Sequence, residues 1–426
     1  MKKIISVTFF SGLLTLTRMM SGFIIAKFIA LYTGPSGLAL LSQLQNISNI
    51  LNGFATSSVG QGIVKYTAEK KNGGLETCSS WWKAGLMISF ISLLISSPLI
   101  LLFSRQISEF LLGDEDYYLF ILLIIASTPL AIIGTLLLSI LNGLEEYKKY
   151  IVASIISVIF SCLLMIILVY SYGVIGALIS ASIQNGLLGL ITIICVFRQK
   201  WFRLNFFWGY VNKEQLKGIS GYALMAIVSA ISIPITQLAI RYIMVHKVGW
   251  DITGQWQAVW KISEVYLSVI TLSLSTYFLP KLSSLKNMRE IQKEISSAFL
   301  IIFPLVVVMA FGIYFLRDFI ILVLFTSNFN TSREYFSIQL LGDVIKIISW
   351  LYAYPMISRG MVKLYICTEI IFSLVFVFLS YVLINKYEAH GANYAYLITY
   401  VMYFITMYIF MARITKRESY ENFVSR

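Results

Sequence analysis

Residues 254–275, GQWQAVWKISEVYLSVITLSLS, decide how this chain folds, because a polar face runs along an otherwise apolar helix. Steps of three and four residues place seven side chains on one helical face: Gly254, Gln257, Lys261, Glu264, Ser268, Thr271 and Ser275. The flanking chain is hydrophobic throughout, so this face is expected to line a wet interior within a membrane protein.

The composition of the whole chain agrees with this interpretation. Of 426 residues, 58% are hydrophobic and only 12% are charged, about half the charged share of a soluble domain. Several apolar runs exceed the roughly 18 residues that mark a transmembrane helix, and the regular alternation of an outer-membrane barrel is absent from the sequence. We predict twelve spans, at residues 6–31, 38–63, 81–103, 117–141, 151–172, 174–197, 218–245, 254–280, 295–316, 333–357, 362–385 and 391–413.

The first span begins like a secretory signal peptide, with Lys2 and Lys3 before an apolar run. Arg18 interrupts that run, no cleavage site with paired small residues follows, and the apolar pattern resumes as far as Ala30. We therefore expect an uncleaved first membrane span.

The distribution of Lys and Arg predicts the orientation. With both termini in the cytoplasm, nearly every basic loop lies inside, whereas the outer side holds only Arg105, Lys247, Arg317, Arg333 and Lys386. The net charge of +13 thus reflects topology and contact with anionic membrane lipids, and nucleic acid is not expected as a partner. The basic and aromatic loop 198–217 is expected on the inner surface.

The sequence repeats itself after about 215 residues. Gly176 then falls on Gly391 and Lys148 on Lys363. The polar face has a counterpart, in which Ser42, Asn46, Asn49, Gly53, Thr56 and Gly60 match Gln257, Lys261, Glu264, Ser268, Thr271 and Ser275. Six spans per half give both halves the same orientation, which is a transporter architecture with its site between the halves. We predict an N-terminal six-helix lobe (1–197), a cytoplasmic loop (198–217) and a C-terminal six-helix lobe with a short tail (218–426).

Eight charged residues fall within the predicted spans. The bases are Arg18, Lys27, Arg241, Lys261 and Lys346, and the acids are Glu264, Asp343 and Glu369. Each would cost roughly 2.5–3.5 kcal/mol if it faced lipid at the membrane centre, so most must face a cavity or one another. The tenth span carries its own polar stripe, made by Gln339, Asp343, Lys346 and Ser349.

Structural interpretations of these charges stay open. Lys261 with Glu264, and Asp343 with Lys346, lie three residues apart and could form ion pairs that lock helices together. Lys27 lies near the outer end of its span, where its side chain could extend to the headgroups.

Glu369 and Arg241 differ in whether a structural role explains their charge. Glu369 could merely neutralise Lys363 or a neighbouring helix. Arg241 has no acidic residue three or four positions away, and an unpaired arginine deep in a span points to function.

The five bases and three acids favour an anionic substrate, because Arg grips phosphate oxygens bidentately. No P-loop motif is present, so an ion gradient, the membrane potential or the substrate gradient must drive any transport. Asp343 and Glu264 are candidates for a carboxylate that titrates. The four cysteines are scattered and His246 and His390 lie in outer loops, so we expect no metal, no cofactor and no enzymatic chemistry.

Nearly the whole chain resembles the lipid-linked oligosaccharide flippases, the polysaccharide transporter branch of the multidrug/oligosaccharidyl-lipid/polysaccharide exporter superfamily. The chain resembles flippases for O-antigen units and for the enterobacterial common antigen lipid. Six stretches carry the resemblance: AKFIALYTGPSGLALLSQ (26–43), IVKYTAEK (63–70), QWQAVWKISEVYL (255–267), STYFLPKLSSL (275–285), FLRDFIILVLFTSNF (315–329) and IQLLGDVIKI (338–347).

The resemblance implies an all-α membrane protein with two lobes around a V-shaped cavity. It implies that an undecaprenyl-pyrophosphate-linked oligosaccharide crosses the bacterial inner membrane by alternating access, with a polysaccharide polymerase and chain-length proteins as possible partners. It also implies that basic cavity residues, here Arg18, Lys27, Arg241 and Lys346, bind the pyrophosphate. Lys261 has no clear counterpart in the family pattern, although its place on the polar face makes it a further candidate.

Three alternatives remain at this point. A multidrug exporter of the same superfamily would share the fold, although an acid-dominated cavity would be expected there. A polysaccharide polymerase would be expected to carry a larger outer loop than 104–117 or 317–333. A non-transporting scaffold would not need polar faces in corresponding spans of both halves.

Overall fold

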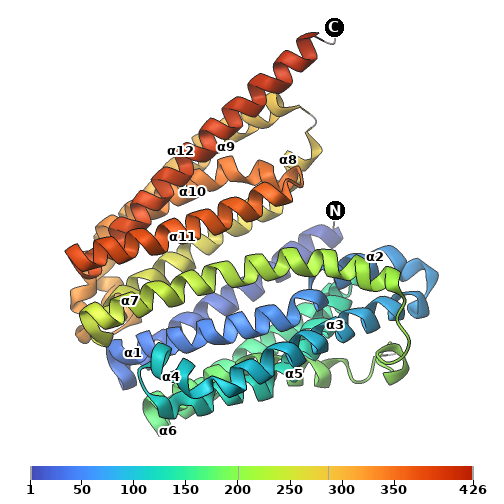
Figure 1. Ribbon diagram of the computed structural model, residues 1–426, viewed down its shortest axis with the longest axis horizontal. Coiled ribbons are helices and arrows are strands. Elements are labelled where there is room, and N and C mark those ends of the chain that lie inside the picture. The colour runs from blue at the N-terminus through green and yellow to red at the C-terminus, as the bar shows by residue number, and fades with distance from the viewer. Residues whose placement is uncertain (1, 200, 286, 425–426) are drawn as a thin grey trace. The chain divides into compact units, whose positions relative to one another are not determined.

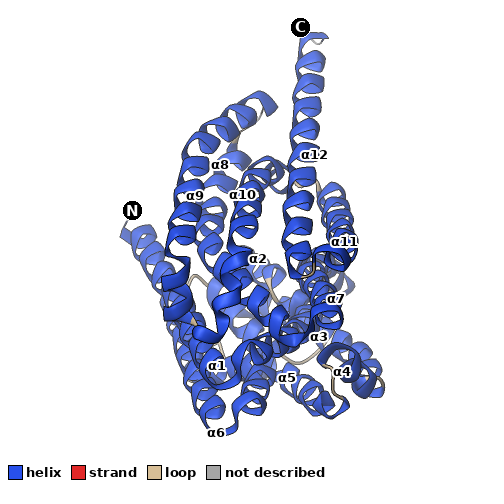
Figure 2. Ribbon diagram, turned by 90° about the vertical axis from the view of Figure 1, so that its left-hand side faces the viewer, coloured by secondary structure: helices blue, strands red, loops and turns tan. Residues whose placement is uncertain are grey.

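The computed structural model describes residues 2–199, 201–285 and 287–424, with their side chains at 10, 12–57, 59–60, 62–199, 201–220, 227, 230–274, 277–278, 281–285 and 287–415. These residues form helices and short connections, and none of them lies in a strand (Figure 2).

Twelve α-helices follow one another along the described part of the chain (Figure 1). They are α1 (Lys2–Thr56), α2 (Gln61–Lys70), α3 (Leu75–Leu102), α4 (Ser104–Leu112), α5 (Tyr118–Gly143), α6 (Tyr147–Val196), α7 (Lys213–Ser273), α8 (Leu279–Ser284), α9 (Met288–Leu324), α10 (Phe336–Ser358), α11 (Val362–Tyr387) and α12 (Ala389–Val424). A π-helical turn, Leu274–Phe278, joins α7 to α8.

Three of these helices are hairpins of two spans each. The backbone leaves the helical conformation at Gly34 in α1, at Gly173 in α6 and at Gly249 in α7. Each break falls in a predicted connection between two spans. Adding the two halves of these three helices to α3, α5, α9, α10, α11 and α12 gives a helical segment for each of the twelve predicted spans.

The internal repeat is visible in the backbone itself. Residues with positive φ recur at a spacing of 215 in three pairs: Gly34 and Gly249, Glu145 and Gly360, and Gly173 and Glu388. The hydrogen bonds around the second pair recur too. The amide of Glu146 donates to Leu141 O at 2.9 Å, and the amide of Met361, 215 residues later, donates to Met356 O at 2.8 Å.

Close helix approach explains the matched glycines Gly176 and Gly391. A Cβ atom at Gly176 would lie 1.9 Å from Leu168 O, and one at Gly391 would lie 2.2 Å from Leu383 O. The two carbonyl groups are themselves 215 residues apart. Any larger residue would push apart the two helices of these hairpins.

Contacts group the described residues into two compact units. One holds the chain up to Thr33 together with Leu40–Leu238, and the other holds Gly34–Ala39 with the chain from Ala239 onward. The start of α7 therefore packs with the first unit. The lobe boundaries inferred from the sequence stay a prediction.

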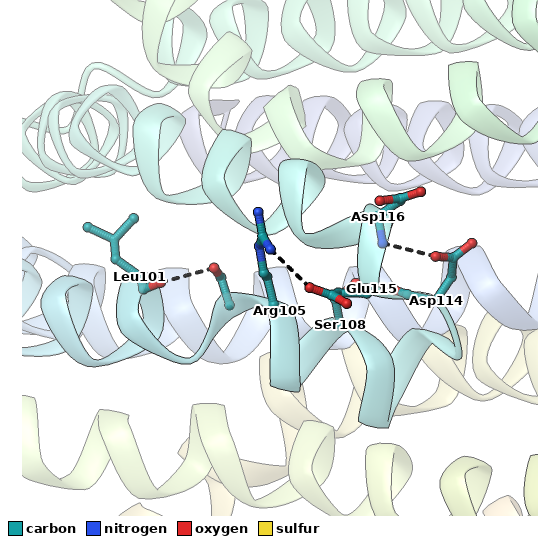
Figure 3. A network of polar contacts seen from close by, with 7 residues as sticks. Leu101, Arg105, Ser108, Asp114, Glu115 and Asp116 are labelled. Atoms are coloured by element: carbon teal, nitrogen blue, oxygen red, sulfur yellow. Dashed lines mark hydrogen bonds and ion pairs between the residues drawn. The ribbon is translucent and has the colours of Figure 1, made fainter.

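A polar network joins α4 to the turn that precedes α5 in the first unit (Figure 3). Arg105 Nη1 lies 3.2 Å from Glu115 Oε1, and Ser108 Oγ donates to Asp114 O at 2.6 Å. The side chain of Asp114 accepts from the amide of Asp116 at 2.9 Å and so caps the short turn before α5. This connection, 104–117, is thus an ordered helix and turn.

Replacing Glu388 by glycine is expected to stabilise the protein by about 1 kcal/mol. Glu388 has φ 53° and ψ −135°, far from the left-handed helical region that side chains tolerate, whereas its counterpart Gly173 has φ 56° and ψ −129°. Thermal unfolding in detergent would measure the gain. Glu145→Gly is the control, since Glu145 pairs with Lys71 and its replacement loses that ion pair. A lower melting temperature for Glu388→Gly would contradict the assigned strain.

Candidate functional site

Arg241 lies buried where α7 folds back on itself. The break at Gly249 brings residue 241 beside residue 257, and Arg241 Nε donates to Gln257 Oε1 at 2.8 Å. The two side chains are each only 3% exposed, and the negative charge of Glu264 also attracts the guanidinium. The expectation that Arg241 is unpaired is therefore wrong. Its partner is the amide side chain of Gln257, sixteen residues away on the other arm of the hairpin.

Asp343 is the centre of a buried hydrogen-bond network in the second unit. Its Oδ2 atom accepts from Ser263 Oγ at 2.6 Å and from the Tyr266 hydroxyl at 2.7 Å. Its Oδ1 atom accepts from the Tyr396 hydroxyl at 2.7 Å and from Gln339 Nε2 at 3.3 Å. A carboxylate offers about four acceptor positions, so these donors saturate it. The network ties α10 to α7 and α12.

Lys346, one helical turn from Asp343, lies among four aromatic rings. Its Nζ atom is 5.8 Å from the ring centroid of Trp260, 5.2 Å from that of Trp350, 5.5 Å from that of Tyr396 and 5.2 Å from that of Tyr400. Such rings attract a cation through their negative faces. The side chain remains partly exposed. We call Lys346 and these four aromatic residues the lysine cage.

Three carboxylates surround this cation without pairing with it. The charges of Asp343, Glu264 and Glu369 all attract Lys346, yet among the described side chains none comes within ion-pair distance of its ammonium group. The ion pair between Asp343 and Lys346 considered from the sequence is therefore not formed. The charge of Glu369 acts on Lys346 of α10 and on Tyr400 of α12, which agrees with the expectation that it could neutralise a neighbouring helix.

The other predicted ion pair does form, at a more exposed position of α7. Lys261 Nζ lies 3.5 Å from Glu264 Oε2, and the two side chains are 37% and 50% exposed. Glu264 Oε1 also accepts from Trp260 Nε1 at 3.0 Å, so this carboxylate is linked to the lysine cage. An exposed pair of this kind contributes about 0–1 kcal/mol to stability.

The hydroxyl groups on the remaining polar face of α7 donate hydrogen bonds to carbonyl groups of the same helix. Ser268 Oγ donates to Val265 O at 2.6 Å, and Thr271 Oγ1 donates to Ser268 O at 3.1 Å. Both side chains are partly exposed and keep acceptor capacity. The side chain of Ser275 lies outside the described residues.

The first unit holds the other predicted residues. Arg18 and Asn49 are exposed, Lys27 is partly exposed and Asn46 is buried. The second unit thus carries three of the five bases and all three acids singled out in the spans, whereas the first unit carries two bases and no such acid. The surplus of positive charge noted in the sequence belongs to the first unit.

Sequence reasoning missed the neutral partners of this site. Tyr396 and Tyr400 belong to the lysine cage, but their helix α12 carries no charged residue nearby to draw attention to them. Asn393, one turn earlier, accepts from Trp256 Nε1 at 2.6 Å and donates to Tyr335 O at 2.9 Å. The spacing of Asn393, Tyr396 and Tyr400 by three and four residues was the available signal.

A buried amide cluster in the first unit was also missed. Gln43 Nε2 donates to Leu238 O at 3.3 Å, and Asn52 Nδ2 donates to Ser48 O at 2.9 Å. Asn185 Nδ2 reaches Ser48 Oγ at 3.3 Å. These residues lie on faces of α1 and α6 other than the predicted polar stripe.

Comparison with known proteins places this chain among polysaccharide transporters. The model of the family described as polysaccharide biosynthesis protein matches residues 4–286. The lipid III flippases of Escherichia coli (strain K12) and Shigella flexneri are each 28% identical to this chain over 395 residues, which cover 92% of the chain and 94% of each relative.

Solved structures show the same fold. An inward-facing MATE family multidrug resistance transporter of the MOP superfamily aligns with a TM-score of 0.76 and 13% identity, over 95% of this chain and 96% of its own. The lipid II flippase MurJ, in an inward closed conformation, aligns with a TM-score of 0.72 and 16% identity, over 99% of this chain and 92% of its own. At these identities the likeness concerns the fold alone, and it confirms the predicted all-α membrane fold of about twelve spans in two six-helix lobes.

Proposed function

Because the chain belongs to the polysaccharide biosynthesis protein family, we propose that it is a flippase for a lipid-linked oligosaccharide. Its substrate is an undecaprenyl-pyrophosphate-linked oligosaccharide, either an O-antigen unit or a related glycolipid. The protein carries it from the inner to the outer leaflet of the bacterial inner membrane by alternating access. The likeness to the two lipid III flippases supports this substrate class.

The lysine cage is the observation that carries the proposal. A Lys ammonium has three donors, and Lys346 makes no ion pair among the described residues although three carboxylates lie near it. The four rings stabilise the cation without neutralising its charge, so that the charge stays available to an incoming anion. Lysine serves as a compact point charge for phosphate. We assign Lys346 as the main diphosphate ligand of the second unit.

The other bases have supporting roles in this proposal. Arg18 and Lys27 supply the positive charge of the first unit, and Lys261 contacts the glycolipid head group once the pyrophosphate competes with Glu264. Arg241 is held by its hydrogen bond to Gln257, and its guanidinium reaches the substrate when the helices rearrange during transport. The polar residues Asn46, Asn49, Ser268 and Thr271 contact the sugars.

The acids divide into two roles. Asp343 is saturated by four donors and is therefore a positioning residue that holds α10 and with it Lys346. Glu264 and Glu369 are not saturated in this way and are the candidates for proton or ion coupling. Transport of an intact glycolipid breaks no bond, so the protein is a transporter and not an enzyme.

The orientation follows the Lys and Arg bias. We place both termini in the cytoplasm, so that the glycolipid is taken from the inner leaflet while its lipid tail remains in the bilayer. The flipped product then serves a polysaccharide polymerase and chain-length proteins on the outer side.

Flipping by purified protein in liposomes tests the proposal. A fluorescent undecaprenyl-pyrophosphate oligosaccharide is compared with the organic cation ethidium as substrate. Movement of the glycolipid alone is the expected result. Movement of ethidium alone would reject the substrate class and favour a multidrug exporter, the alternative that shares this fold.

Arg241→Ala is expected to slow glycolipid flipping by about 10-fold, because a hydrogen bond to a charged group contributes about 1.5–3 kcal/mol. Membrane insertion should be unchanged. The control is Arg317→Ala, since Arg317 donates to Tyr314 O within its own helix α9 and touches none of the site residues. Equal flipping by the wild-type protein and Arg241→Ala would remove Arg241 from the transport mechanism.

A further inference from the structure

The linker segment, residues 198–217, connects α6 to α7 and includes the first residues of α7, and one of its faces is fixed to the first unit. Trp201 is buried, and the rings of Phe206 and Phe207 lie 6.3 Å and 5.9 Å from the ring of Trp82 on α3. Ser79 Oγ donates to Phe206 O at 3.1 Å and ties down the backbone between them. The linker is therefore an anchored element and not a loose tether.

The opposite face of the linker is apolar and uncovered. Leu204 is 82% exposed, and Trp208 and Tyr210 are each 87% exposed. Single exposed apolar side chains are common on proteins, but three within seven residues on an anchored segment form a patch that calls for a partner. Since Phe206 and Phe207 point to the core, the run 204–210 is amphipathic.

Positive charge surrounds this patch. Arg198, Arg203, Lys213 and Lys217 are all exposed, and none of them takes part in an ion pair with another described side chain. Glu214 is the only acidic residue of the linker. On α3, the ammonium group of Lys83 lies 3.2 Å from the position that a Cβ atom would take at Gly209. Any partner of the linker must therefore tolerate or carry negative charge.

The place of the linker in the chain indicates which partner this is. It follows α6, which ends at Val196 and is long and apolar enough to cross a membrane, and it runs into α7, which holds the predicted spans 218–245 and 254–280. Trp and Tyr are enriched where a membrane meets water, and clustered Lys and Arg beside spans attract anionic headgroups. A protein partner would need a matching acidic surface, whereas an anionic leaflet is already adjacent.

We propose that the linker binds the anionic leaflet on its own side of the membrane. Leu204, Trp208 and Tyr210 insert at the level of the headgroups, and the surrounding cations hold phospholipid phosphates. The linker is thus bound on two faces, to the first unit by its inner aromatic residues and to acidic phospholipid by its outer ones. This inference does not depend on the transported substrate.

Spin labelling at position 208 tests the inference. The full-length protein with Trp208→Cys, in a background where the four native cysteines are replaced, is placed in nanodiscs of phosphatidylcholine alone or mixed with phosphatidylglycerol. In the mixed nanodiscs, collisions of the label with oxygen are expected to exceed collisions with a water-soluble nickel chelate. The same label at the exposed position 214 is the control and should report water. A label at 208 that reports water in both nanodiscs would overturn the proposal and leave a protein as the partner.

A second variant separates charge from insertion. Arg203→Gln, Lys213→Gln and Lys217→Gln together should make position 208 several-fold more accessible to the nickel chelate in the mixed nanodiscs. These three side chains are exposed, so folding should be preserved, and thermal unfolding checks it. An unchanged label depth would show that anionic headgroups play no part. The measurement of label depth involves no transport, so its result does not depend on the flippase proposal.

Discussion

Lys346→Met is expected to slow glycolipid flipping by about 10- to 100-fold, the largest loss among single changes in the bases. The variant removes a cation of the second unit that lies among four aromatic rings and that forms no ion pair with a described carboxylate. A hydrogen bond to a charged group contributes about 1.5–3 kcal/mol, and each 1.4 kcal/mol corresponds to a factor of ten. Methionine fills a similar volume and packs well against aromatic rings, so the site should keep its shape. Flipping of the fluorescent glycolipid in liposomes is the measurement.

Lys261→Met is the matched control for this prediction. Lys261 is also a lysine near Glu264, but its ion pair is exposed and its side chain lies outside the lysine cage. We expect flipping to fall less than about fivefold, since exposed pairs contribute about 0–1 kcal/mol. Equal losses in the two variants would mean that total charge matters and the cage does not.

Asp343→Ala is expected to destabilise the protein by about 3–5 kcal/mol, the largest effect on stability. The change leaves the hydroxyls of Ser263, Tyr266 and Tyr396 buried without their acceptor, and it removes a charge that attracts Lys346. Each orphaned buried group costs about 1–3 kcal/mol, and loss of one member of a buried charge network costs similar amounts again. Thermal unfolding in detergent, together with the yield of folded protein, measures the loss.

Ser349→Ala provides the comparison on the same helix. Ser349 is also buried on α10, but its hydroxyl donates only to Lys346 O, within the helix. Its removal should cost about 1 kcal/mol or less. Asp343→Asn should fall between the two variants, because it keeps one acceptor oxygen. A destabilisation by Asp343→Ala no larger than that by Ser349→Ala would refute the central role of the network.

The sequence was sufficient for the fold because two simple signals repeat along it. Apolar runs long enough to cross a membrane identify the spans, and the 215-residue repeat identifies the two halves. The glycines that mark the repeat lie in helices, where close packing against a second helix restricts the choice of residue. Gly176 and Gly391 illustrate this, because each permits a helix contact that no Cβ atom would allow.

The site was predicted only in part, because the spacing of residues along one helix does not predict which residues of other helices they contact. Asp343 and Lys346 were found from their rarity within a span, and their shared position on α10 suggested a pair. Their actual partners are hydroxyls and rings from α7 and α12, whose residues are common in any membrane helix. Arg241 was misread for the same reason. Its partner Gln257 becomes a neighbour only after the chain reverses at Gly249.

The paired turns also record the thickness of the membrane. Residues 145 and 173 in the first half, and 360 and 388 in the second, lie 28 positions apart and bracket one span each. At 1.5 Å per helical residue this is about 42 Å, which matches a bilayer of about 40–45 Å including its headgroups. The residues at these turns differ between the copies, Glu145 against Gly360 and Gly173 against Glu388, yet the number of residues between the two turns is the same in both. The thickness of the bilayer therefore constrains the length of these spans, so one-residue insertions in them should be tolerated less well than most substitutions.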